Sequence, residues 1–107
     1  LLFELPFYEQ PEGVGDFIFK SHLKGIYPIL AHPERYAYLR NTPQILRNWH
    51  QQGCLLQLNA GSLTGQFGPK IETFARKLLK ARLIHFVASD AHDAEYRNYE
   101  ITHEAEN

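Results

Sequence analysis

Residues 54–88 read CLLQLNAGSLTGQFGPKIETFARKLLKARLIHFVA, and this stretch decides the fold class. It begins and ends with short apolar runs of strand length, residues 54–58 and 83–88. Between them, the Gly-rich segment 59–68 precedes residues 69–81, whose apolar positions recur every three or four residues as on the buried face of a helix. A strand, a helix and a strand in this order predict a βαβ unit with parallel strands.

The segments before residue 54 continue this alternation. Residues 1–5 and 27–31 are predicted strands, residues 13–24 and 43–52 are predicted helices, and the polar tail beyond Glu95 is predicted as loop or short helix. We expect Gly25 to close the first helix in a left-handed conformation. We expect the Thr42 hydroxyl to cap the second helix, with Pro43 in its first position. The fold class is therefore α/β, with alternating βα units and parallel strands.

The composition is that of a soluble, packed protein with a single domain. The 107 residues are 44% hydrophobic and 21% charged, with a net charge of -1. The bases are scattered along the chain, which argues against a nucleic-acid partner. No apolar run approaches the roughly 20 residues that span a bilayer, so we expect no membrane insertion. We expect a cytoplasmic protein.

The single cysteine, Cys54, excludes an internal disulfide and fits a reducing compartment. Some phosphatases use a nucleophilic Cys with a phosphate-binding Arg six residues later, but position 60 is Ala. Cys54 also opens an apolar run, where a small buried thiol is ordinary packing. We therefore predict that Cys54 belongs to the core.

Polar side chains occur where the predicted strands end. Glu4 lies at the end of the first strand, His32 and Asn59 follow the next two, and Asp90 and His92 follow the fourth. The carboxyl ends of parallel strands form one face, where α/β proteins build ligand sites. Imidazole and carboxylate groups bind Zn, Mn and Fe ions. The sequence thus predicts a metal site at this face.

Other interpretations apply to these residues taken one at a time. His32 and Glu34 could form a capping turn around Pro33, and Asp90 could cap a following helix. Capping does not explain why the polar groups share one end of the sheet. The remaining histidines are predicted to be surface residues or satisfied core residues: His22, His50, His85 and His103.

Two arginines lie close to the predicted ligands in sequence. Arg35 follows His32 by three residues, and Arg97 follows His92 by five. Guanidinium groups match phosphate oxygens well, so both could present their donors to a phosphate at the metal face. From the residues alone, the alternative of a solvated surface position is favoured for both arginines.

Four segments together carry a family resemblance: LLFELPF, PILAHPERY, QLNAGSLTGQFG, and LIHFVASDAHD with Arg97 after it. In this order they resemble the metal-dependent bacterial protein-tyrosine phosphatases of the polymerase and histidinol phosphatase (PHP) superfamily. These enzymes belong to capsule and exopolysaccharide operons. The resemblance runs over nearly the whole chain.

The resemblance implies a distorted (β/α)7 barrel, TIM-like, with two or three metal ions, most often Mn²⁺, with Zn²⁺ or Fe as alternatives. It implies metal ligands at Glu4, His32, Asp90 and His92, phosphate contacts at Arg35 and Arg97, and no direct chemistry for Asn59 and Ser62. The implied reaction is hydrolysis of phosphotyrosine by a metal-bound hydroxide. The implied protein substrate is an exopolysaccharide tyrosine autokinase.

The sequence departs from that family in one respect. The family begins with a His-x-His motif on its first strand, and no His-x-His occurs here. We therefore expect residues 1–107 to be a single partial domain, the C-terminal part of a PHP barrel. Its open sheet edge would permit association into a homo-oligomer. Two alternatives stay open: another PHP phosphoesterase, acting on histidinol phosphate or a nucleic-acid end, and a catalytically incomplete fragment.

Overall fold

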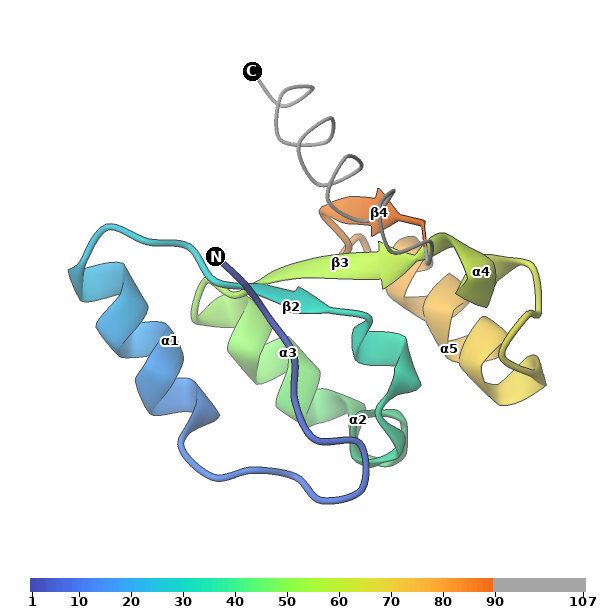
Figure 1. Cartoon of the computed structure of the whole chain (residues 1–107), viewed down its shortest axis with the longest axis horizontal. Helices are drawn as coiled ribbons and strands as arrows, with labels where there is room; N and C mark the ends of the chain where they lie inside the picture. The colour runs from blue at the N-terminus through green and yellow to red at the C-terminus, as the bar shows by residue number, and fades with distance from the viewer. Residues whose placement is uncertain (90–107) are drawn as a thin grey trace.

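A parallel four-stranded sheet organises the protein (Figure 1). The computed structural model describes residues 1–89. The strands are β1 (Leu2–Phe3), β2 (Ile29–Ala31), β3 (Leu55–Asn59) and β4 (Phe86–Ala88), adjacent in that order. Every neighbouring pair is parallel. All four carboxyl ends therefore lie at the same edge of the sheet.

Each connection between strands contains a helix. The long helices are α1 (Val14–Leu23), α3 (Pro43–Gln51) and α5 (Pro69–Lys80). Figure 1 shows all three on the same side of the strands. The short ones are η1 (Pro33–Arg35), a 3₁₀ turn, α2 (Ala37–Asn41) and α4 (Ala60–Leu63). They lie just beyond the carboxyl ends of β2 and β3.

The core lies between the sheet and the long helices. Leu30 and Leu56 are register partners in β2 and β3, and both are fully buried. They belong to one cluster with Ile18 of α1, Leu46 of α3 and Leu78 of α5. Burial of each such side chain contributes about 1.5–3 kcal/mol to the free energy of folding. The helical periodicity therefore places the apolar stripes of the helices against the apolar runs of the strands.

The predicted order of strands and helices is confirmed, and Gly25 adopts the predicted left-handed conformation with φ 74°. Thr42 is the N-cap residue of α3 and Pro43 begins the helix, as predicted, but the expected cap by the Thr42 hydroxyl is wrong. The Thr42 side chain makes no capping hydrogen bond, and its backbone carbonyl instead accepts from Ile45 N at 3.1 Å. The first strand is shorter than expected, because only Leu2 and Phe3 pair with β2.

The short elements η1, α2 and α4 were not expected, because each is too brief for an apolar period to show.

Within residues 1–89, no helix is both long and apolar enough to cross a membrane.

Candidate metal and phosphate site

Three of the predicted polar residues meet at the carboxyl edge of the sheet. Glu4 and His32 come directly after β1 and β2, and Asn59 is the last residue of β3. The Glu4 Oε1 and His32 Nε2 atoms are 3.3 Å apart. The predicted ligands Asp90 and His92 lie outside the described residues, as does Arg97. The structure thus joins a carboxylate and an imidazole that are 28 positions apart in the sequence.

His32 is held rigidly at this edge. Its backbone has φ 38°, a left-handed conformation that is uncommon outside glycine, and its N–H donates to Gln57 O at 2.8 Å. Its ring stacks on Phe7 with centroids 5.6 Å apart, and Tyr36 lies 5.4 Å away on centroids. Only 8% of the residue is exposed. Strained backbone positions of this kind cluster at functional sites.

The segment that carries Glu4 is tied to the turn that follows β2. The Tyr36 hydroxyl accepts a hydrogen bond from Leu5 N at 2.8 Å. The Tyr38 hydroxyl donates to Pro6 O at 2.6 Å. Burial raises the pKa of Tyr36 well above its usual range, so its hydroxyl stays protonated. These two bonds place Glu4 opposite His32.

The donor set here fits part of a metal site. Glu4 is mostly exposed and His32 presents Nε2 toward it, so both atoms can reach one ion. The His32 Nδ1 atom is buried and makes no hydrogen bond to residues 1–89, although ligating histidines normally donate from their second nitrogen. Within that range, no group of three His, Cys, Asp or Glu residues is placed to hold a metal ion. The pair therefore needs further ligands, and Asp90 and His92 are of the right type.

Arg35 lies beside the pair with its guanidinium packed against two aromatic rings. Its Cζ atom is 4.3 Å from the ring centroid of Phe67 and 5.4 Å from that of Phe7. Such cation–π contacts fix a guanidinium without using its N–H donors. Within residues 1–89, no carboxylate forms an ion pair with Arg35. Its donors can therefore serve an anion from outside the chain.

Glu34 is completely buried and joins this turn to the end of β3. Its Oε2 atom accepts from Asn59 N at 2.9 Å and from the Ser62 hydroxyl at 2.6 Å. Desolvation raises the pKa of Glu34, while the bonds from Ser62 and Asn59 act in the opposite direction. The alternative of a local capping turn does not hold for the Glu34 side chain, because its hydrogen-bond partners lie 25 and 28 residues away.

Asn59 and Ser62 each take part in a hydrogen bond that holds the end of β3 and the start of α4 together. The Asn59 Oδ1 atom accepts from Gly61 N at 2.9 Å and so caps α4, while the buried Ser62 binds Glu34. Sequence reasoning missed the aromatic residues Phe7, Tyr36 and Phe67. Phe7 and Tyr36 lie within the quoted motifs, but a motif does not show which rings will face a histidine or an arginine.

The residues predicted to stay outside the site do so where the structure describes them. His22 Nε2 donates to Gly53 O at 3.3 Å, and His85 Nδ1 accepts from Leu56 N at 3.1 Å. His50 stacks on His85 with centroids 5.4 Å apart. Cys54 is buried, and burial raises the pKa of its thiol to about 12. His103 lies outside the described residues.

Comparison with known proteins gives a consistent set of relatives. A family model for capsular polysaccharide synthesis, CpsB/CapC, matches residues 1–107. The tyrosine-protein phosphatase YwqE of Bacillus subtilis is 41% identical over 99 residues, which cover 92% of this chain and 39% of YwqE. The putative tyrosine-protein phosphatase CapC of Staphylococcus aureus is 35% identical, with the same coverage of each chain.

The match extends to three dimensions. A chain from the crystal structures of YwqE from Bacillus subtilis and CpsB from Streptococcus pneumoniae, unique metal-dependent tyrosine phosphatases, superposes with a TM-score of 0.80. It is 41% identical, and the match covers 89% of this chain and 38% of that one. The present chain therefore spans about two fifths of the length of these relatives.

Proposed function

Because this chain belongs to the CpsB/CapC family, we propose that it supplies part of the active site of a metal-dependent protein-tyrosine phosphatase. The observation that carries the proposal is the contact of Glu4 with His32 at one edge of the sheet, with Phe7 packed on both His32 and Arg35. Two ligand-type groups and one guanidinium without an ion-pair partner in residues 1–89 are some of the parts that a metal-assisted phosphoesterase uses. The names of the relatives point to the same chemistry.

Glu4, His32, Asp90 and His92 would hold the metal, with further ligands from elsewhere in a protein of full family length. A divalent ion bound there would act as a Lewis acid and would lower the pKa of the water molecule that it binds. We propose Mn²⁺, with Zn²⁺ or Fe as the ions that metal analysis would otherwise find, since carboxylate and imidazole sites accept all three. The chain's part is to fix Glu4 and His32 through the Tyr36 bond and the Phe7 stack.

Arg35 and Arg97 would bind the phosphate. Arg35 is fixed by Phe67 and Phe7, so little side-chain entropy is lost when its donors engage phosphate oxygens. Donors placed in advance stabilise the charge that develops during phosphoryl transfer. No nucleophilic side chain is needed, which agrees with the buried, protonated Cys54.

We further propose that the four strands are the C-terminal part of a distorted (β/α)7 barrel. The all-parallel sheet with its long helices on one side is the arrangement that such a barrel repeats. The substrate would be a phosphotyrosine protein, namely the tyrosine autokinase of exopolysaccharide synthesis, in the cytoplasm. The single thiol of Cys54 is compatible with that compartment.

The test uses a protein of full family length that contains this chain, loaded with Mn²⁺. We expect it to hydrolyse phosphotyrosine peptides with a higher kcat/KM than histidinol phosphate or a 3′-phosphorylated oligonucleotide. His32→Ala should lower kcat/KM by at least about 100-fold and reduce the metal content. His50→Gln, a histidine outside the site, is the control. Unchanged phosphotyrosine hydrolysis by His32→Ala would refute the proposal.

A further inference from the structure

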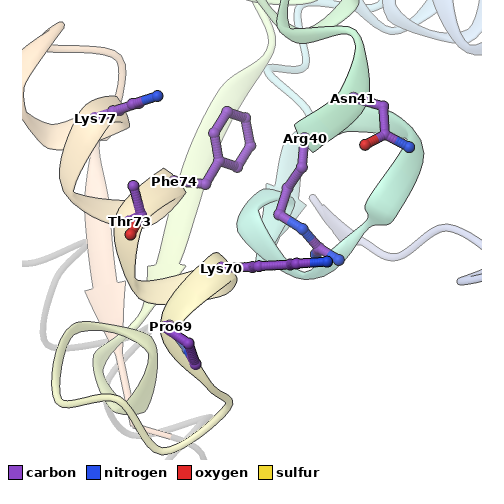
Figure 2. Close-up of a pocket in the computed structure, with 7 residues that line it drawn as sticks. All are labelled: Arg40, Asn41, Pro69, Lys70, Thr73, Phe74 and Lys77. Carbon is purple, nitrogen blue, oxygen red and sulfur yellow. The ribbon is translucent and has the colours of Figure 1, made fainter.

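A pocket lined by cationic side chains lies between α2 and the first turns of α5. It has a volume of about 420 Å³, and it shares no lining residue with the predicted metal and phosphate site. Arg40, Lys70 and Lys77 contribute three cations to its wall, with the Thr73 hydroxyl between the two lysines in sequence. Figure 2 shows Arg40 and Lys70 extending toward the space between the two helices. No carboxylate lines the pocket.

The charge of this pocket is not neutralised by its surroundings. Within residues 1–89, no carboxylate forms an ion pair with Arg40, Lys70 or Lys77. The segment 40–82 contains seven Lys and Arg residues but a single acid, Glu72. Glu72 already binds Arg76 at 3.1 Å. Three bases from two separate segments of the sequence therefore line one pocket, and their mutual repulsion favours a bound anion.

The pocket adjoins the turn that carries the candidate site. Arg40 Nη1 donates to the backbone carbonyl of Glu34 at 2.9 Å, directly before Arg35 in the chain. Helix α5 packs against η1, which begins directly after His32. An extended peptide advances about 3.3 Å per residue, so residues close to a bound phosphotyrosine could reach this pocket.

We propose that the pocket binds an anionic residue that flanks the phosphotyrosine of a protein substrate. The residue would be an acidic side chain or a second phosphorylated one, because lysine ammonium groups pair with either carboxylate or phosphate as compact point charges. This inference rests on the proposed function and adds to it a preference among phosphotyrosine sequences. The lysines are exposed, so the preference depends on salt concentration.

The kinetic test compares three phosphotyrosine peptides of equal length in the Mn²⁺-loaded protein of full family length. Their flanking residues are glutamine, glutamate or phosphoserine, so that the last two separate carboxylate from phosphate recognition. We expect the peptides with glutamate or phosphoserine flanks to have a lower KM than the glutamine peptide. In the double variant Lys70→Gln/Lys77→Gln, this difference in KM should shrink by about threefold for each lysine removed. Lys24→Gln, at the carboxyl end of α1 and outside the pocket lining, removes the same charge elsewhere and should retain the preference.

A binding measurement decides the inference without catalysis. A fluorescent glutamate-flanked peptide carrying unphosphorylated tyrosine is titrated with wild type and with the double variant, and its anisotropy is recorded. We expect Kd to rise about tenfold in the double variant and in high salt. Equal Kd values, or equal kcat/KM for all three peptides, would overturn the inference. If no phosphotyrosine peptide is hydrolysed, the proposed phosphatase function fails. The anisotropy measurement would still decide whether the pocket binds an anionic flanking residue.

Discussion

The buried carboxylate of Glu34 gives the most quantitative prediction about the architecture of the site. Its Oε2 atom is the acceptor for both Asn59 N and the Ser62 hydroxyl, and no part of the residue is exposed. Glu34→Ala would leave two buried donors without an acceptor. Each unsatisfied donor costs about 1–3 kcal/mol. The variant also no longer has to bury a carboxylate, and the desolvation penalty that it avoids offsets part of this loss. We therefore expect a net decrease of about 3 kcal/mol in the free energy of unfolding.

Two partner variants show whether the hydrogen bonds are the cause. Glu34→Gln keeps one acceptor oxygen and should lose about half as much stability as Glu34→Ala. Ser62→Ala removes one of the two bonds, and a double-mutant cycle with Glu34→Ala should give a coupling energy of about 1.5 kcal/mol. Glu9→Ala, at an exposed position, should change stability by less than about 0.5 kcal/mol.

The assay is urea unfolding followed by circular dichroism, in EDTA so that metal affinity does not enter the result. The m-value should be the same in all variants. The differences in urea midpoint then report differences in stability and not a change in the unfolded state. A Glu34→Ala loss below about 1 kcal/mol would refute the reasoning. So would a coupling energy near zero between Glu34 and Ser62, because the two side chains would then act independently.

Three shorter predictions follow from other contacts. The thiol of Cys54, with a pKa of about 12, should resist thiol reagents in the native protein at pH 8 and react quickly in 6 M urea. Rapid labelling of Cys54 in the native protein would contradict its burial. Phe67→Leu should raise KM for p-nitrophenyl phosphate about threefold with a smaller change in kcat, because Arg35 loses a stacking partner. An unchanged KM would show that Phe67 does not position the Arg35 guanidinium. Gly53→Ala should lower the free energy of unfolding by at least about 1 kcal/mol, because φ is 101° and a Cβ would lie 2.2 Å from the His22 ring; equal urea midpoints would contradict this.

The sequence by itself determined the α/β fold class and most of the strand and helix order. Periodicity carries this information because a helix and a strand bury residues at different spacings, and α5 shows the helical spacing throughout its length. It also determined that Glu4, His32 and Asn59 end up at one edge, since parallel strands align their carboxyl ends. The family resemblance, now confirmed by the CpsB/CapC match, implied metal-binding roles for Glu4 and His32.

Only the tertiary structure decided which side chains touch. The 3.3 Å approach of Glu4 to His32, the packing of Arg35 against Phe67 and the long-range bonds of Glu34 all join residues more than 20 positions apart. The gathering of Arg40, Lys70 and Lys77 around one pocket is of the same kind. Local patterns fix which face of an element is apolar, but contacts between distant side chains depend on strand register and helix packing, which sequence spacing does not specify.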